Sequence, residues 1–407
     1  MEAIGILSKC TGVPRARFST AGTKDKRSIS VQLVSGYGIT NLNLEKANAM
    51  LRGMKVGPGE HKKDQVRLGD LSGNQFGIIL RDIEPCSSQD LTDLQQRVEA
   101  VKQDGFLNFY GKQRFGSHSI STDEIGCKIL KGDWEGAVSL IMTPHDTDRQ
   151  EFRFAKDLYA EGKIEEALRA IPRFSTCEKA ILEFFKVEKN RTDFLGALSC
   201  LPRNMRLMYV RAYQSRIWNE MVCKRIEMGR DVMEGDLVSF SDCSVDVEDE
   251  DVGKETSRRD QQVVVVTKEL LEAWKSEEKV VGLEHVVLPL PGYEITYPPN
   301  LVTHYEELMR IDTIDPHDMK RSQKEFSLGG AYRHIITKVN EIDMKILKDV
   351  GKDFLDMNGV IEGTEEVPIE NVAQGDNFAV YLQFKLGTSS YATMFLRELL
   401  GQHPVEN

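Results

Sequence analysis

The sequence predicts an α+β protein of two domains, one inserted into the other, and three observations carry this prediction. The chain has 407 residues, more than the roughly 250–300 at which a single hydrophobic core stops growing. Near both ends of the chain, the alternating patterns of strands are mixed with helical periods. The middle is dominated by helical periods, so we expect the two ends to form one domain that the middle interrupts.

The first part of the chain contains two expected strands and one expected helix. Polar and apolar residues alternate over 28–33, which is typical of a strand with one buried face. Residues 76–80 form a short apolar run that favours a buried strand. After Ser88 four apolar residues fall on one helical face before Gly105, a helix stop. These are Leu91, Leu94, Val98 and Val101.

The later elements follow the same reasoning. Residues 151–201 are largely helical in period, and a long amphipathic helix that contains Trp218 is expected after Pro202. Residues 378–386 alternate over a long stretch, and 391–400 favour a short helix that Gly401 closes. Strand and helix patterns therefore return at the carboxyl end.

Composition excludes several classes of protein. The chain is 40% hydrophobic and 29% charged, and no apolar run approaches the ~20 residues that a membrane helix needs. The first residues lack the basic start and the cleavage site of a secretory signal, so an intracellular protein is expected. Neither a Cys-x-x-Cys pair nor a His-Glu-x-x-His motif occurs, and we expect no metal.

Charge is distributed unevenly along the chain. The net charge is −11, yet the residues before Glu84 include 13 Lys and Arg against 7 Asp and Glu. A basic region of this kind fits contact with phosphates, although an uneven solvated surface produces the same pattern. Both interpretations stay open on charge alone.

Two segments have the residue types for chemistry. In residues 21–27 the cations Lys24, Lys26 and Arg27 stand beside Asp25, which favours an ionised carboxylate able to act as a nucleophile or base. A charged turn is the structural alternative. Residues 108–116 combine three aromatic, two basic and two amide side chains with two glycines, either to stack and hydrogen-bond a nucleobase or to pack aromatic rings into the core.

Seven short motifs are distributed along nearly the whole chain. They are Gly22-x-Lys24-Asp25-Lys26-Arg27, Leu68-Gly69-x-Leu71-x-Gly73-Asn74-x-Phe76, Asn108-Phe109-Tyr110-Gly111-x-Gln113-Arg114-Phe115-Gly116, Ala212-Tyr213-Gln214-Ser215-x-x-Trp218-Asn219, Leu288-Pro289-Leu290-Pro291-Gly292, Phe326-Ser327-Leu328-x-Gly330-Ala331-Tyr332-Arg333 and Ser390-Tyr391-Ala392-Thr393-Met394-x-x-Arg397-Glu398. In their order and spacing they resemble the motifs of the TruD family of pseudouridine synthases. The later motifs are most similar to those of eukaryotic members, the pseudouridylate synthase seven and seven-like proteins.

The resemblance implies a fold, a domain division and an activity. It implies an α+β catalytic domain with a mixed or antiparallel sheet, formed by residues 1–145 and 326–407 and split by an inserted domain at 146–325. Family members isomerise uridine to pseudouridine within RNA without a cofactor or metal. They break the N1 glycosidic bond, turn the base and rejoin it through C5, and Asp25 matches their essential aspartate.

The resemblance also implies substrate contacts. The target base must leave its stack to reach a carboxylate. We assign Tyr110 to stacking on the base and Asn108 to hydrogen bonding. The cations Lys24, Lys26, Arg27 and Arg114 are assigned to phosphates; a structural ion pair is the alternative for Arg114. Structural roles are favoured for Trp218, Tyr391 and Arg397.

Relatives usually carry additional strands before the aspartate, and these strands are missing here. We expect either a truncated or late-starting form of the protein, or strands supplied by residues outside this sequence. An RNA-binding homologue with reduced or no turnover is therefore the alternative function. The expected partner is RNA, either tRNA alone or tRNA and mRNA, bound by a monomer away from membranes. The expected compartment is the nucleus, with the cytoplasm and the mitochondrion as alternatives.

Overall fold

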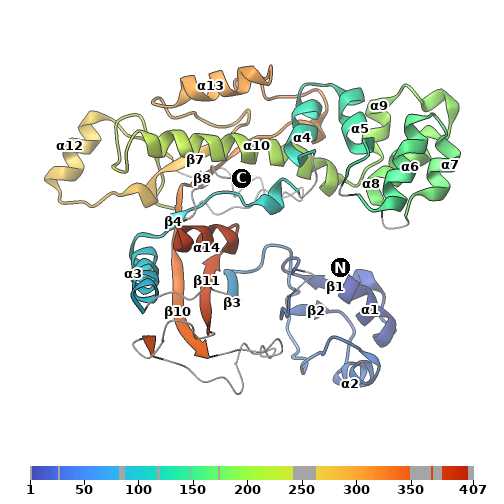
Figure 1. Ribbon diagram of the computed structural model, residues 1–407, viewed down its shortest axis with the longest axis horizontal. Helices are drawn as coiled ribbons and strands as arrows, with labels where there is room; N and C mark the ends of the chain where they lie inside the picture. Colours follow the sequence, from blue (N-terminus) through green and yellow to red (C-terminus); the bar gives the residue numbers. More distant parts are fainter. Residues whose placement is uncertain are drawn as a thin grey trace. The chain divides into compact units, whose positions relative to one another are not determined.

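A computed structural model describes most of the chain and divides it into two compact units. One unit comprises Met1–Glu99 with Val339–Thr388, and the other comprises Ala100–Lys338 with Ser389–Asn407. The residues described are 2–25, 28–81, 88–116, 120–146, 148–172, 175–241, 263–348, 368–369 and 378–401. The predicted boundaries at 145 and 325 differ from this division and stay a prediction. Each unit is considered separately below (Figure 1).

The first unit begins with a small α/β region. It consists of α1 (Glu2–Thr11), β1 (Phe18–Thr20), β2 (Val34–Gly36) and α2 (Asn41–Met50). The strands β1 and β2 pair antiparallel, with Phe18 opposite Gly36. Helix α2 begins with a capping box, in which the backbone N–H groups of Thr40 and Asn43 each donate to the other residue's side chain.

The predicted strand over 28–33 is wrong. These residues are not assigned to a strand, which begins only at Val34. Ile29, Val31 and Leu33 are 59%, 67% and 80% exposed. Alternation gives a segment the tendency to extend, but a strand needs a neighbour to accept its hydrogen bonds and cover its apolar face. Among the described residues none does so.

A three-stranded antiparallel sheet completes the first unit. Its order is β10 (Val339–Lys348), β11 (Phe378–Gly387) and β3 (Gly73–Leu80). The central strand β11 is the most buried, and Phe384 stacks on Phe76 of β3 with ring centroids 5.4 Å apart. The strands predicted over 76–80 and 378–386 are confirmed, since β3 and β11 cover them. They were predictable because an apolar run or a long alternation of apolar residues fits few other structures.

The second unit begins within α3 (Ser88–Asp104), the predicted helix. Leu91, Val98 and Val101 are buried on one face, and Gly105 ends the helix with φ +80°. A set of helices follows, with α6 to α9 gathered beyond one end of the long α10 (Figure 1). They are α4 (Thr122–Leu130), α5 (Trp134–Met142), α6 (Gln150–Ala160), α7 (Ile164–Ala170), α8 (Thr176–Phe185), α9 (Phe194–Ser199) and α10 (Arg203–Glu227).

Short antiparallel ladders and three more helices complete this unit, and of these β7 and α13 pack against α10. The ladders are β4 (Phe106–Leu107) with β9 (Ile336–Thr337), β5 (Leu237–Val238) with β6 (Val264–Val265), and β7 (Val287–Leu290) with β8 (Ala331–His334). The helices are α12 (Lys268–Ser276), α13 (Val302–Ile311) and α14 (Ala392–Leu400). Mixed helices and antiparallel sheets confirm the predicted α+β class. In the described part of the chain no helix is long and apolar enough to cross a membrane.

Candidate functional site

Asp25 lies in an exposed loop of the first unit. The loop follows β1 and is tied to residues further along the chain, because Gly69 N–H donates to Ala21 O over 2.8 Å. Lys24 Nζ donates to Asn74 Oδ1. Asp25 itself is exposed, and Ser28 Oγ donates to its backbone carbonyl rather than to its carboxylate. A carboxylate in this setting is open to a large substrate.

Lys26 and Arg27 lie outside the described residues. The neighbouring Lys24 is exposed, as a phosphate contact requires. The assignment of Lys24, Lys26 and Arg27 to phosphate contacts stays a prediction.

The segment Asn108–Tyr110 is buried in the second unit. It continues from β4, and the N–H of Asn108 donates to Ile335 O over 2.9 Å. Asn108 is 7% exposed and Tyr110 is 5% exposed. Gly111 follows where a Cβ atom would come within 2.9 Å of Tyr391 Cδ1, so the close packing here depends on glycine.

The Asn108 side chain is engaged within the protein. Its Nδ2 donates to His334 O over 3.2 Å, and its Oδ1 accepts from Arg333 Nη2 over 2.6 Å. One side chain holds both backbone groups of Tyr110, because its N–H donates to Asn219 Oδ1 and its carbonyl accepts from Asn219 Nδ2, at 2.9 and 3.0 Å. The amide and the ring predicted to meet a base are therefore fixed in position by other side chains.

The Tyr110 ring is enclosed by aromatic and cationic groups. The Arg333 guanidinium lies 4.3 Å from its centroid and that of Arg114 lies 5.2 Å away. Trp218 and Tyr391 meet the ring edge-on, at 5.6 and 6.1 Å between centroids. A base can stack on this ring only after some of these groups move.

The segment also has an exposed half. Lys112 and Gln113 are exposed on the short 3-10 turn Lys112–Arg114, while Arg114 is 8% exposed. The assignment of Arg114 to a phosphate stays a prediction, and its burial is compatible with the structural alternative.

Sequence reasoning did not assign roles to Arg333 and Asn219, which bind this segment most closely. Both stand inside motifs quoted for the family resemblance, and that was the only signal that could have found them. The predicted structural role of Trp218 is confirmed, because its side chain is 0% exposed and its Nε1 donates to Leu288 O over 3.1 Å. Tyr391 contacts Tyr110, which agrees with a packing role.

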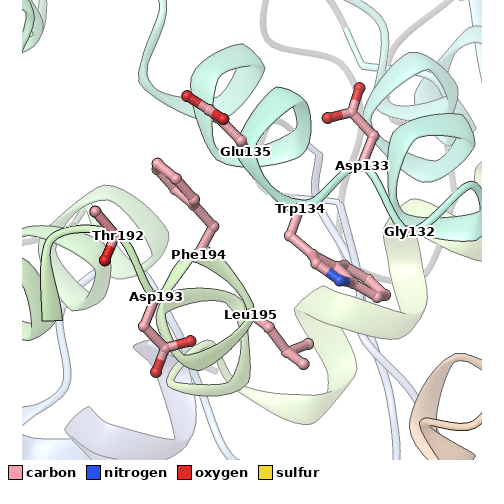
Figure 2. Close-up of a pocket in the computed structure, with 8 residues that line it drawn as sticks. All are labelled: Gly132, Asp133, Trp134, Glu135, Thr192, Asp193, Phe194 and Leu195. Carbon is pink, nitrogen blue, oxygen red and sulfur yellow. The ribbon is translucent and has the colours of Figure 1, made fainter.

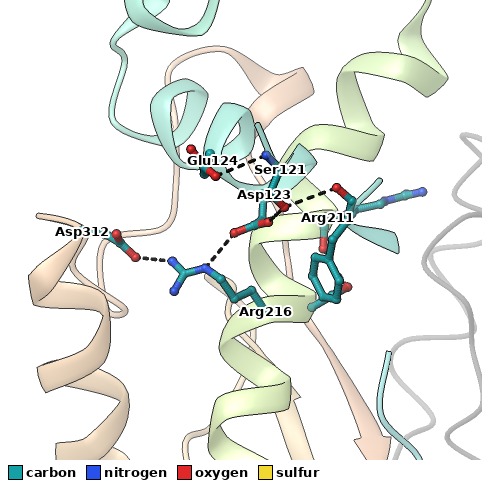
Figure 3. Close-up of polar contacts among 8 residues, drawn as sticks. Ser121, Asp123, Glu124, Arg211, Arg216 and Asp312 are labelled. Atoms are coloured by element: carbon teal, nitrogen blue, oxygen red, sulfur yellow. Dashed lines mark hydrogen bonds and ion pairs between the residues drawn. The ribbon is translucent and has the colours of Figure 1, made fainter. Parts of the chain in front are cut away.

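A polar cluster joins three helices elsewhere in this unit. Figure 3 shows Arg216 of α10 between Asp123 of α4 and Asp312, which follows α13. Arg216 Nε lies 3.0 Å from Asp123 Oδ2, and Nη2 pairs with Asp312. Burial and then the nearby Asp312 carboxylate raise the pKa of Cys127 to about 11, so this thiol is protonated at neutral pH. We interpret the cluster as structural.

An open pocket of about 430 Å³ lies at the amino ends of α5 and α9 (Figure 2). Trp134, Phe194 and Leu195 supply its apolar wall, and the N-cap residues Asp133 and Asp193 stand at its rim. No predicted site residue lines it. Within the described ranges no three His, Cys, Asp or Glu side chains are grouped as metal ligands would be.

Comparison with known proteins gives the class and then the family. The α+β fold matches the crystal structure of the putative tRNA pseudouridine synthase D (TruD) from Methanosarcina mazei, with a TM-score of 0.68 and 26% identity over 99% of this chain and 85% of that one. The model of the family "tRNA pseudouridine synthase D (TruD)" matches residues 1–399. The chain belongs to the TruD family.

Two curated relatives are similar over nearly the whole chain. Multisubstrate pseudouridine synthase 7 of Schizosaccharomyces pombe is 32% identical over 98% of this chain and 60% of its own length. Pseudouridylate synthase 7 homolog of Homo sapiens is 32% identical over 98% of this chain and 57% of its own length. The chain therefore spans somewhat more than half the length of these relatives.

Proposed function

We propose that this chain is an RNA pseudouridine synthase that converts uridine to pseudouridine in tRNA, in mRNA or in both, with Asp25 as its catalytic carboxylate and no cofactor. Membership of the TruD family supports the reaction class. The observation that carries the assignment of Asp25 is its exposed carboxylate, next to residues that hydrogen bonds from Gly69 and to Asn74 hold in place.

In the proposed reaction Asp25 acts on the target nucleotide, either at C1′ of the sugar or at the base. The N1–C1′ bond breaks and a C5–C1′ bond forms. The C5 proton leaves to solvent and N1 gains a proton, so the change is an isomerisation that needs no oxidant or reductant. An ionised carboxylate is the chemically competent form for either route.

The other residues proposed to contact RNA are of two kinds, exposed and buried in the free protein. Lys24 is exposed and is proposed to hold a phosphate together with Lys26 and Arg27. Tyr110, Asn108 and Arg114 are proposed to meet the flipped base and its phosphate. Because these three are buried in the free protein, we propose that RNA binding opens one side of the Tyr110 ring.

The proposal includes a setting for the enzyme. The partner is RNA, the protein acts as a monomer, and the compartment is the nucleus, with the cytoplasm and the mitochondrion as alternatives. Light scattering of the purified chain and microscopy of a tagged chain test the last two statements.

A second candidate function is RNA binding with reduced or no turnover. The observation that favours it is the weak support behind Asp25, where Ile29, Val31 and Leu33 are each more than half exposed. A loop with so little packing is poorly pre-organised for chemistry. The two functions differ in one measurement, because only turnover releases the C5 proton.

Nucleoside mass spectrometry of RNA treated with the purified chain tests the proposal. Pseudouridine is expected with the wild-type chain and not with Asp25→Asn. Asp64→Asn is the matched control, because Asp64 is an exposed carboxylate of the same unit, and it should leave the yield unchanged. Equal yields from wild type and Asp25→Asn would overturn the assignment of Asp25. No yield from folded wild type that binds RNA would favour the second function.

A further inference from the structure

Arg333 is a buried cation on β8 of the second unit. The residue is 4% exposed, and its backbone pairs with Leu288 of β7. Among the described residues it forms no ion pair with a carboxylate. Burying a charge without a counter-ion is costly, so its surroundings must compensate through hydrogen bonds and ring contacts.

The guanidinium is directed at one residue 225 positions away in the sequence. Nε and Nη2 donate to Asn108 O over 3.0 and 2.8 Å, and Nη2 also donates to Asn108 Oδ1 over 2.6 Å. Nη2 reaches Ser389 O over 2.8 Å as well. Arg333 therefore holds both the backbone and the side chain of Asn108, and it links them to the segment before α14.

The same guanidinium lies against two aromatic rings. It is 4.3 Å from the Tyr110 centroid and 5.3 Å from the Trp218 centroid, distances typical of cation–π contacts. Trp218 is itself bonded to Leu288 O, directly opposite Arg333 in the β7–β8 ladder. Strand β7, Trp218, Tyr110 and Arg333 therefore contact one another in turn. These contacts fix the Arg333 guanidinium relative to the Tyr110 ring.

We propose that Arg333 is a positioning residue for the reaction, which holds the Asn108 amide and the Tyr110 ring in the geometry that receives the base. This inference rests on the proposed function. The hydrogen bond from Arg333 leaves the Asn108 oxygen on one defined side and its nitrogen on the His334 carbonyl. A lysine cannot reproduce it, because its compact ammonium lacks the planar fork of donors.

The test compares Arg333→Lys with Arg225→Lys. Arg225 is 0% exposed and pairs with Asp236 in the same unit, so its replacement lowers stability without touching Asn108 or Tyr110. At a temperature where both variants are folded, Arg333→Lys should slow single-turnover pseudouridine formation by about 10-fold to 100-fold. Its RNA dissociation constant should change by less than about 3-fold. Arg225→Lys should retain the wild-type single-turnover rate.

Hydrogen exchange provides a readout that does not depend on turnover. The amide N–H groups of Asn108 and Tyr110 are bonded to Ile335 O and Asn219 Oδ1, and their exchange should become faster in Arg333→Lys but not in Arg225→Lys. Unchanged exchange, or a wild-type rate in folded Arg333→Lys, would overturn the inference. The two failures are distinguishable, because a wild-type chain without product overturns the proposed function itself.

Discussion

The two groups of predicted site residues lie in regions that are packed in opposite ways. In the described part of residues 2–71, only Leu7 and Ala47 are buried hydrophobic residues, and the region holds nine of the eighteen exposed large hydrophobic side chains of the described chain. Residues 106–110, by contrast, bury Phe106, Asn108, Phe109 and Tyr110. The region around Asp25 is thinly packed, and the segment around Tyr110 is packed tightly.

Because of this difference in packing, only some substitutions can change activity without also changing stability. A change in the thinly packed region removes few contacts, so its effect on activity can be measured in folded protein. A change around Tyr110 removes packing and hydrogen bonds together, so its effect on stability must be measured first.

Trp218→Ala should have the largest effect on stability. The side chain is 0% exposed and supports both Tyr110 and Leu288. Removing a buried aromatic ring of this kind costs about 3–5 kcal/mol. Chemical denaturation measures the change, with Trp218→Phe as a milder control that keeps a ring but loses the hydrogen bond. A loss below 1 kcal/mol for Trp218→Ala would contradict the close packing around Tyr110.

Asp148→Asn should have the next largest effect, through the buried pair with Lys156. Their side chains are 7% and 4% exposed, and Lys156 Nζ lies 3.0 Å from Asp148 Oδ2. Breaking one partner of a buried pair costs about 3 kcal/mol. Glu60→Gln, in the exposed pair with Lys62 of the first unit, is the matched control and should cost less than about 0.5 kcal/mol.

The effect of Asp148→Asn should depend on pH in one direction. Burial alone would raise the pKa of Asp148, but hydrogen bonds from Lys156 and from the His145 N–H lower it more, so the net shift is downward. A carboxylate with a lowered pKa in the folded state stabilises it above its unfolded pKa of about 3.9, and this advantage is lost as the pH falls further. Urea unfolding at pH 7 and pH 3 should therefore show a smaller difference between wild type and variant at the lower pH. A difference that grows on acidification would contradict the assignment.

Leu33→Ser should have the smallest effect on stability. Leu33 is 80% exposed, and surface substitutions usually change stability by no more than about 0.5 kcal/mol. Removing an exposed apolar side chain should also reduce self-association, which light scattering over a concentration series measures. A loss of several kcal/mol would mean that Leu33 is buried in solution.

The sequence predicted elements with a long and consistent period. The helix that contains Trp218 and the strand over 378–386 were found because their apolar spacing allows one interpretation. Residues 28–33 have an equally regular alternation, yet they are not a strand, because a period describes one segment and not the neighbour that would pair with it.

The candidate site was predictable only in part. Asp25 and Tyr110 were selected by motif, but the sequence left open whether the Tyr110 ring was a stacking surface or a core residue, and in the free chain it is 5% exposed. The hydrogen bonds from Arg333 to Asn108 connect residues that are 225 positions apart in the sequence. No local pattern encodes such a contact, because it depends on the β7–β8 ladder and α10 together.

Release of tritium from C5 of uridine in labelled RNA tests the proposed catalytic role of Asp25. It is measured for wild type and Asp25→Asn, with thermal unfolding followed on the same samples. We predict release by wild type, none by Asp25→Asn, and unfolding midpoints within about 2 °C of each other, because Asp25 is exposed in a thinly packed region. Release by Asp25→Asn at the wild-type rate, or a variant that loses activity only because it unfolds, would contradict the account.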